Sequence, residues 1–207
     1  MVIYSYVIAR DFGFAPNPFF RHCTLAACKP IIRKNAQIGD WVIGTVSAAK
    51  NSELKNRLVY AMRIEEKLTF DDYWNDNRFF CKRPVMNGSQ KQLYGDNIYH
   101  INPNTGKFIQ ENSHHSLEGG LVNMKNYIRD LSSKFVLISK TYWYFGEKAI
   151  QIPDKLKGII KSGQGHKKID DIILIKIFVG WIQKQKEHGF IEKPTKFSEE
   201  FERYKGE

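Results

Sequence analysis

The sequence predicts an α+β fold, with strands in the earlier part of the chain and helices towards its C-terminal end. Segments rich in β-branched and aromatic residues recur up to residue 145, and the longest helical pattern follows residue 170. We therefore expect a central, mostly antiparallel sheet or a small barrel, with C-terminal helices. Residues 1–150 should form the α+β core domain, and residues 151–207 a helical extension packed on the same domain.

Four segments have the composition of buried strands. Residues 2–9 are β-branched and aromatic almost throughout. Residues 41–46 and 134–139 are short apolar runs, and residues 57–65 alternate apolar side chains with polar or smaller ones. These four segments predict most of the central sheet.

The barrel alternative comes from one turn. Gly39-Asp40 lies between the basic pair Arg33-Lys34 and the apolar strand at residues 41–46. A Gly-Asp turn in this setting resembles small barrels of the pseudouridine-synthase-and-archaeosine-transglycosylase (PUA) type, although ordinary β-turns share the pattern.

Two helices are predicted from their capping residues. Thr69 is a good N-cap for a short helix, because its hydroxyl can accept a hydrogen bond from a free backbone N–H. Asp170 is expected to cap a C-terminal helix whose buried face includes Ile173, Ile177 and Trp181.

Composition and charge predict a cytoplasmic protein with a polyanionic partner. Hydrophobic residues make up 42% of the chain, with 14 Phe and 10 Tyr, which is enough for a packed core. Lys and Arg outnumber Asp and Glu by 32 to 22, a net charge of +10 that favours nucleic acid, nucleotides or anionic lipid. No segment has the length of a membrane span or the pattern of a signal peptide, so no membrane partner is expected.

The most polar stretch lies at residues 93–100. If it forms a strand, alternation places Asp96 and His100 on one face and Asn97 and Tyr99 on the other. Asp96 and His100 could then act as an acid–base pair in one pocket. The alternative is that Gly95-Asp96-Asn97 is simply a turn.

A second candidate is the loop that follows the first strand. Asp11 ends the strand and Asn17 lies in an aromatic, proline-containing loop. A carboxylate there could stabilise an oxocarbenium-like sugar or activate water, as in glycoside chemistry. The alternative is that Asp11 caps the loop or pairs with Arg10.

The tandem histidines His114-His115 lie between Ser113 and Ser116. Adjacent strand residues point to opposite faces and rarely bind the same ion, so we expect no metal. One histidine, with Ser113 or Ser116, is expected to bind a phosphate or a base edge. The alternative is one exposed histidine and one satisfied core histidine.

The basic segment Gly163-Gln164-Gly165-His166-Lys167 precedes the C-terminal helix. Backbone N–H groups and lysines before a helix suit a phosphate, although the spacing is neither a Walker loop nor a Rossmann fingerprint. The alternative is a flexible basic linker.

The three cysteines are odd in number and fit no zinc or disulfide pattern. Cys23 or Cys28 could act as a nucleophile only with a base beside it, and the sequence neighbour is His22. Sequence adjacency is weak geometry for such a pair, so a thiol mechanism is not favoured.

Several of these motifs together resemble a known family. The motifs are Ala9-Arg10-Asp11-Phe12-Gly13-Phe14-Ala15-Pro16-Asn17-Pro18-Phe19, Cys23-Thr24-Leu25-Ala26, Lys29-Pro30, Gly39-Asp40-Trp41-Val42-Ile43-Gly44, Gly95-Asp96-Asn97-Ile98-Tyr99-His100 and Ser113-His114-His115-Ser116. They resemble the second type of nucleotide modification associated domain, an α+β domain of bacteria and phages. The resemblance implies a link, through genomic association, to DNA base modification or its restriction, and it brings no established reaction. The polar positions that match the family are Asp11, Asn17, Asp40, Asp96, Asn97, His100, Ser113, His114 and His166.

The leading functional hypothesis is an enzyme that acts on a nucleotide or a DNA base, by hydrolysis or transfer at a glycosidic or related bond. The competing hypotheses are a non-catalytic PUA-like reader of modified bases, and a subunit of a phage-defence complex with partner proteins from its operon. Catalytic roles are predicted for Asp11, Asp96, His100 and His114. Substrate-binding roles are predicted for Asn17, Asn97, Tyr99, Ser113, His115 and Ser116. Phosphate binding is predicted for Gly163, Gly165, His166 and Lys167, with no cofactor and no metal.

Overall fold

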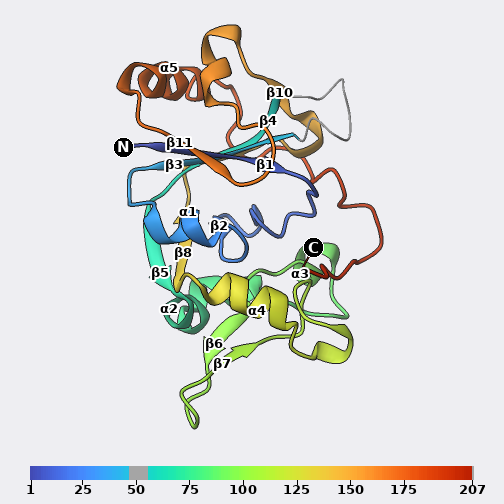
Figure 1. The fold of residues 1–207 in the computed structure, drawn as a ribbon. Coiled ribbons are helices and arrows are strands. Elements are labelled where there is room, and N and C mark those ends of the chain that lie inside the picture. The colour runs from blue at the N-terminus through green and yellow to red at the C-terminus, as the bar shows by residue number, and fades with distance from the viewer. Residues whose placement is uncertain (47–55, 207) are drawn as a thin grey trace.

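A seven-stranded sheet forms the upper half of the molecule in the computed structural model, which describes residues 1–46 and 56–206 (Figure 1). The strand order is β11-β1-β3-β4-β9-β12, and β10 pairs with β4. The strands are β1 (Ile3–Ile8), β3 (Trp41–Val46), β4 (Arg57–Arg63), β9 (Tyr142–Tyr144), β10 (Ile150–Gln151), β11 (His166–Ile169) and β12 (Gly189–Phe190). The pairs β1–β3 and β9–β12 are parallel and the others antiparallel. The predicted α+β class with a mostly antiparallel sheet is confirmed, and the sheet does not close into a barrel.

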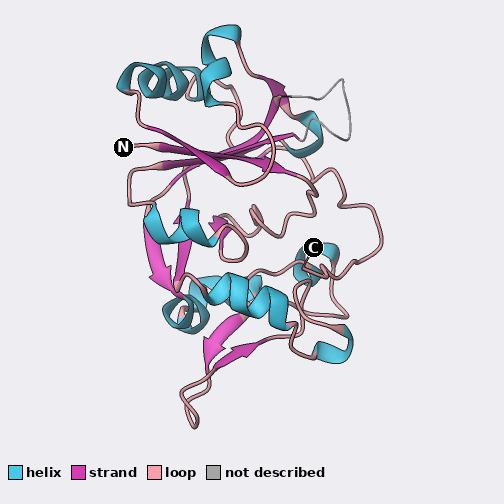
Figure 2. Ribbon diagram, in the orientation of Figure 1, coloured by secondary structure: helices cyan, strands magenta, loops and turns pink. Residues whose placement is uncertain are grey.

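A smaller sheet and a hairpin lie below the central sheet (Figure 2). The smaller sheet has the order β2-β8-β5, with strands Cys23–Leu25, Phe135–Ser139 and Glu66–Thr69. The hairpin pairs β6 (Tyr99–Ile101) with β7 (Phe108–Gln110). The predicted strand at residues 134–139 is therefore confirmed, but it belongs to the second sheet.

Helices cover both faces of the central sheet. The α-helices are α1 (Pro30–Asn35), α2 (Phe70–Asn75), α3 (Gln90–Leu93), α4 (Met124–Leu131) and α5 (Ile172–Ile182). Four 3-10 turns are η1 (Asn77–Lys82), η2 (Glu118–Gly120), η3 (Gly146–Lys148) and η4 (Asp154–Ile159). Helix α5 lies on one face of the sheet and α1 on the other, with α4 farther from the sheet, below α1 (Figure 1).

The predicted caps are right for α2 and displaced by one residue for α5. Thr69 Oγ1 accepts a hydrogen bond from the Asp72 N–H (3.1 Å), as expected. Asp171, and not Asp170, caps α5, and its Oδ1 accepts from the N–H groups of Ile173 (2.9 Å) and Leu174 (3.1 Å).

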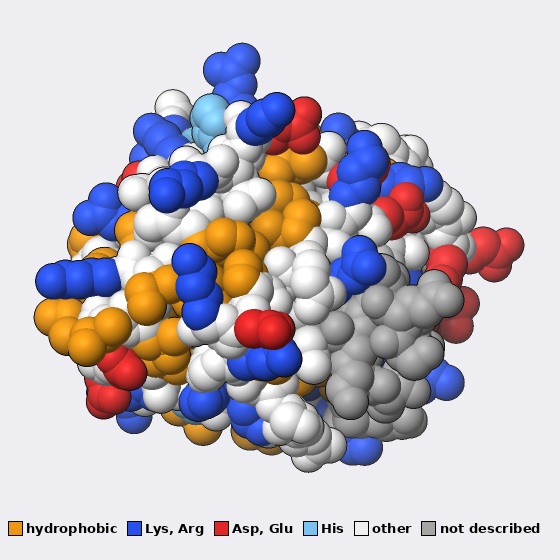
Figure 3. All heavy atoms as spheres, turned by 90° about the horizontal axis from the view of Figure 1, so that it is seen from above, with side chains coloured by type: hydrophobic (Ala, Val, Ile, Leu, Met, Phe, Trp, Pro, Cys, Tyr) orange, Lys and Arg blue, Asp and Glu red, His pale blue; other side chains and the backbone are white. Residues whose placement is uncertain are grey.

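The predicted buried face of α5 is only partly right, because Ile177 and Trp181 are partly buried against the core but Ile173 is not. Ile175, Phe178 and Ile182 are buried, whereas Ile173 is 68% exposed. The helix is apolar on almost every side, so its periodicity does not select one face. Figure 3, viewed from the α5 side, shows hydrophobic side chains among lysines and arginines on this face. Within the described residues, no helix is long and apolar enough to cross a membrane.

The core is divided between the two faces of the central sheet. Strand alternation sends Trp41 and Ile43 towards α5, where they pack in a cluster with Phe178. The intervening Val42 faces the other way, into a cluster that includes Ile32 of α1. The sheet is thus buried on both faces, and its lower face is the one that carries the candidate site.

Residues 151–206 contribute strands to the central sheet as well as helix α5. Strands β11 and β12 join the central sheet, and the following residues run back towards α3 and α4 (Figure 1). Lys196 N–H bonds the carbonyl of Asp11 (2.9 Å), and Tyr204 N–H bonds the carbonyl of His114 (2.7 Å). The segment therefore connects the two halves of the molecule.

A buried polar network fastens the loop after β1 to the 3-10 turn η1. Asp96 accepts hydrogen bonds from the hydroxyls of Thr24 (2.6 Å) and Tyr73 (2.8 Å). The ammonium group of Lys82 donates to the side chain (2.6 Å) and carbonyl (3.1 Å) of Asn17. The Asp96 carboxyl and the Lys82 ammonium are both fully buried, and each compensates part of the desolvation of the other.

Replacing Asp96 should therefore reduce stability sharply. Asp96→Ala leaves the Lys82 ammonium without its buried counter-charge and two hydroxyls without an acceptor, so we expect the free energy of unfolding to fall by about 3–5 kcal/mol. Urea denaturation measures this change. Asp154→Ala, at a side chain that is 90% exposed, is the matched control and should change stability by less than about 0.5 kcal/mol. Equal effects of the two variants would contradict the role of the network.

Candidate active site

A cavity of about 620 Å³ opens at the C-terminal end of β1, on the lower face of the central sheet. Its walls are residues 6–15, residues 28–32, His114, His115, Arg129, Gly165, His166 and Tyr204. This volume is within the range of small-molecule sites.

Cys28 enters this cavity from a strained turn. Cys28 and Lys29 both have left-handed backbone conformations, with φ of 57° and 41°, immediately before α1 begins at Pro30. Such conformations cost non-glycine residues roughly 1–2 kcal/mol each. Strain of this kind clusters at functional sites, where the surrounding structure holds it in place.

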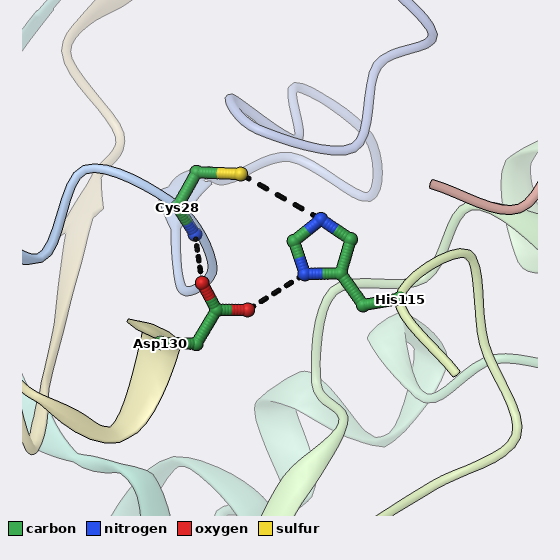
Figure 4. Close-up of side chains that lie close together, drawn as sticks. All are labelled: Cys28, His115 and Asp130. Carbon is green, nitrogen blue, oxygen red and sulfur yellow. Dashed lines mark hydrogen bonds and ion pairs between the residues drawn. The ribbon is translucent and has the colours of Figure 1, made fainter. Parts of the chain in front are cut away.

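His115 links Cys28 to Asp130 (Figure 4). Its Nε2 lies 3.6 Å from the Cys28 Sγ, and its Nδ1 lies 2.6 Å from Asp130 Oδ2. The three side chains come from the turn before α1, the loop after β7 and the end of α4. Thiol, imidazole and carboxylate in this order form the arrangement of a cysteine nucleophile, its acid–base partner and the group that orients that partner.

Asp130 is fully buried and ionised. Besides His115, it accepts hydrogen bonds from the Cys28 N–H (3.0 Å), the Tyr99 hydroxyl (3.1 Å) and Arg129 Nε (3.1 Å). Burial alone would raise the pKa of Asp130, but the charge and hydrogen bond of His115, with Arg129, hold the pKa far below its usual range. The carboxylate therefore keeps its negative charge at neutral pH.

His115 is correspondingly cationic. Burial alone would lower the pKa of His115, but the charge of Asp130 outweighs burial and raises the pKa to about 9. An imidazolium at neutral pH has an N–H on each nitrogen, so Nε2 can donate a proton towards Cys28 or a group bound beside it.

Arg33, a fully buried residue of α1, fastens the Cys28 turn to α4. Its Nε donates to the Cys28 carbonyl (2.8 Å), and a terminal nitrogen donates to the Asp130 carbonyl (2.6 Å). The other terminal nitrogen donates to the carbonyls of Ser133 (3.0 Å) and Phe135 (2.6 Å). Carbonyls at a helix C-terminus carry partial negative charge, which stabilises the buried guanidinium.

Arg129 brings a second cation to the sulfur. Its NH2 lies 4.0 Å from the Cys28 Sγ, and its guanidinium lies 5.1 Å from the centre of the Tyr204 ring. Together with the His115 imidazolium, Arg129 stabilises negative charge on or near the sulfur.

The same three side chains could also be considered as metal ligands, because their donor atoms lie within 4.8 Å of one another. The geometry suits a hydrogen-bonded chain better. His115 faces Cys28 with one nitrogen and Asp130 with the other, so one ion cannot replace both contacts. The oxygens of Asp130 are already occupied by four donors.

Residues 1–201 match the model of nucleotide modification associated domain 2. The chain belongs to this family. Membership suggests a role in nucleotide or DNA modification, with a nucleotide or nucleic acid as the molecule acted on or bound. No curated protein and no solved structure matches the chain.

Five residues that the sequence predicted as functional line the cavity of this family member: Asp11, His114, His115, Gly165 and His166. Burial raises the pKa of Asp11 to about 6, and its carboxylate accepts hydrogen bonds from the Tyr144 hydroxyl and the Thr195 N–H. Burial, together with the charge of His115, lowers the pKa of His114 to about 3, so His114 is neutral. Its ring packs between Phe12 and Phe14.

None of residues 95–100 is among the walls of the cavity. Asp96 belongs to the buried network with Lys82, and the Asn97 amide donates to the carbonyls of Tyr73 (3.1 Å) and Phe79 (3.3 Å). His100 stacks on Trp74, with ring centres 4.0 Å apart, and its Nε2 bonds Glu111 (2.8 Å). The structure does not bring Asp96 and His100 together.

The remaining predicted residues support the site from behind or lie outside it. The Asn17 side chain accepts a hydrogen bond from Lys82, and the Tyr99 hydroxyl donates one to Asp130. Ser116 accepts a hydrogen bond from the Ser113 N–H (3.0 Å) within their turn. Gly163 and Lys167 are not among the cavity walls, and Lys167 donates to the carbonyl of Gly158 (2.6 Å).

The sequence did not predict that Cys28, Asp130, Arg129 and Arg33 come together, and it disfavoured Cys28 as a nucleophile. His22, the histidine adjacent to Cys23 in the sequence, packs its ring on Phe79 instead (5.2 Å between ring centres). The available signal was a cysteine two residues before a proline that can begin a helix. That signal marks Cys28 as a turn residue but does not name its partner.

The His115–Asp130 pair predicts a pH dependence of stability. The pKa of His115 rises from 6.5 to about 9 on folding, so its stabilisation is fully present below pH 6.5 and is lost as pH rises through about 9. The difference in unfolding free energy between the wild type and His115→Gln should shrink by on the order of 3 kcal/mol between pH 6.5 and about pH 10.

Urea denaturation across this range measures that difference. Gln183→Ala changes an exposed residue without a titratable group and should follow the wild type in parallel. A difference for His115→Gln that stays constant with pH would show that His115 is not held as a cation.

Proposed function

We propose that the chain is a cysteine-dependent enzyme of nucleotide or DNA-base modification. Cys28 would be the nucleophile, His115 the proton donor and acceptor, and Asp130 the residue that orients His115. The observation that carries this proposal is the continuous contact from Sγ to Nε2 (3.6 Å) and from Nδ1 to Oδ2 (2.6 Å) at the wall of a ligand-sized cavity.

The reaction that fits this arrangement is hydrolysis or transfer at an acyl or amide carbon carried by a nucleotide or base. The Cys28 thiolate forms a bond to the carbon, the bond to the leaving group breaks, and the leaving group takes the proton from His115. Water or an acceptor then attacks the thioester and gives its proton to the neutral His115. The thiolate leaves, and the imidazolium is restored.

Arg129 is placed to stabilise the oxyanion of this reaction. In many nucleophilic enzymes the backbone N–H of the nucleophile serves this purpose. Here the Cys28 N–H is already bonded to Asp130 (3.0 Å), so it is not available. The Arg129 guanidinium lies 4.0 Å from the sulfur and would supply positive charge to the oxyanion in place of that N–H.

Carboxylate and histidine chemistry at a glycosidic bond is the second candidate for the same cavity. It is favoured by Asp11, whose pKa of about 6 would let it exchange a proton near neutral pH. His114 would be its neutral partner. In this scheme Asp11, rather than Cys28, would carry the reaction.

Alkylation by iodoacetamide tests the thiol directly. Cys81 is exposed and Cys28 is only half-buried, so simple accessibility predicts faster labelling of Cys81. If His115 and Arg129 activate Cys28, peptide mass spectrometry should find Cys28 labelled at least about tenfold faster, and His115→Ala should remove that advantage. Faster labelling of Cys81 would contradict an activated Cys28.

Turnover tests the reaction. Modified DNA, unmodified DNA and free nucleotides are incubated with the protein, and products are followed by mass spectrometry. Cys28→Ala should lower the rate by about 10³-fold or more and Asp130→Asn by about 10²–10⁴-fold, whereas Cys81→Ser should leave it unchanged.

The other outcomes separate the alternatives. Loss of turnover in Asp11→Asn with full turnover in Cys28→Ala would favour the glycosidic scheme. Tight binding of a modified base with no product from any substrate would favour a reader of modified bases and would contradict both enzymatic schemes.

A further inference from the structure

Within the described part of the chain, Lys29 is a cation of the cavity wall without a carboxylate partner. Arg10 pairs with Glu202, and Arg129 pairs with Asp130. For Lys29, no ion pair or hydrogen bond of its ammonium group is present among residues 1–46 and 56–206. Its Nζ lies instead over the Tyr6 ring, 4.6 Å from the ring centre.

The surroundings of Lys29 are short of negative charge. Asp11 is the acidic residue of the cavity wall, and its carboxylate is already held by Tyr144 and Thr195. Burial, with the charge of Arg129, lowers the pKa of Lys29, while the nearby Cys28 opposes this effect. A half-buried ammonium without a counter-ion is costly, and an anionic ligand would relieve that cost.

His166 brings a second donor to the same wall. It is paired with Tyr6 in the β1–β11 ladder, so the two side chains leave the same face of the sheet, and its ring lies 6.0 Å from that of Tyr4. Burial lowers the pKa of His166, and the charges of Lys29 and Lys161 lower it further. A neutral His166 still donates one N–H.

The turn before His166 leaves room for a ligand. Gly165 also lines the cavity, with a φ of 83° and nothing within 4 Å of the position a Cβ would take. An ammonium, an imidazole N–H and an open glycine turn on one wall are the kinds of group that surround phosphate in proteins.

We propose that Lys29 and His166 form an anion subsite that binds the 5′-phosphate of a nucleotide and thereby holds its base side towards Cys28. This proposal rests on the proposed function, because it assigns the substrate class of the same cavity. It makes the preferred substrate a phosphate-bearing nucleotide or a nucleic-acid end, rather than a free nucleoside or base. The cavity volume of about 620 Å³ is sufficient for one nucleotide.

The test measures binding without any need for turnover. Isothermal titration calorimetry with Cys28→Ser protein compares the four 2′-deoxynucleoside 5′-monophosphates, their nucleosides and inorganic phosphate. At least one monophosphate should bind about tenfold or more tightly than its nucleoside, and the difference should shrink with added salt. Inorganic phosphate should compete with that monophosphate.

Variants of the two donors locate the subsite. Lys29→Asn removes the charge and keeps a residue that tolerates the left-handed backbone, so it should abolish the preference for the monophosphate without unfolding the turn. Lys29→Arg should largely restore the preference, and His166→Gln should reduce it. Lys176→Gln, at an exposed position on α5, is the matched control and should leave binding unchanged.

The phosphate subsite and the thiol mechanism can be rejected independently of each other. Equal binding of nucleoside and monophosphate, or equal effects of Lys29→Asn and Lys176→Gln, would overturn the phosphate subsite whatever the reactivity of Cys28. A phosphate preference that depends on Lys29, with an unreactive Cys28 in the alkylation experiment, would keep the subsite and overturn the thiol mechanism.

Discussion

The buried guanidinium of Arg33 is the interaction on which the candidate site depends. It donates to the Cys28 carbonyl on one side and to the carbonyls of Asp130, Ser133 and Phe135 on the other. The turn that carries Cys28 and the helix end that carries Asp130 thus share one rigid, planar donor. The hydrogen bond from Arg33 to the Cys28 carbonyl thus helps to hold the strained, left-handed conformation of Cys28 and Lys29.

This arrangement also sets the charges of the site. Asp130 lies among the cations Arg33, Arg129 and His115, and its negative charge is what keeps the His115 imidazolium protonated. The cations are held by groups outside the cavity or at its edge, so they persist whether or not a ligand is present. The Cys28 thiol therefore lies beside His115 and Arg129 in the folded chain itself.

Local patterns in the sequence predicted the three strands at the centre of the main sheet but not the site. Period-two alternation and strand composition predicted β1, β3 and β4, whereas the uniformly apolar α5 gave no face to choose. The contact between Cys28 and His115 joins residues 87 positions apart and depends on how a turn, a loop and a helix end pack together. Residues 95–100 are unusually polar, which suggested a functional pocket. Burial within a hydrogen-bonded network accounts for their polarity equally well.

Neighbouring residues of the Ser113-His114-His115-Ser116 segment contact different parts of the structure. His115 contacts Cys28, while the carbonyl of its neighbour His114 accepts the Tyr204 N–H (2.7 Å). Ser116 accepts a hydrogen bond from Arg203 (2.7 Å), and the Tyr204 ring then lies against His115, with ring centres 5.4 Å apart. The polar atoms around His115 therefore hold the segment that closes the cavity beside it. Because that segment comes from the far end of the described chain, the cavity is complete only when the last part of the fold has docked.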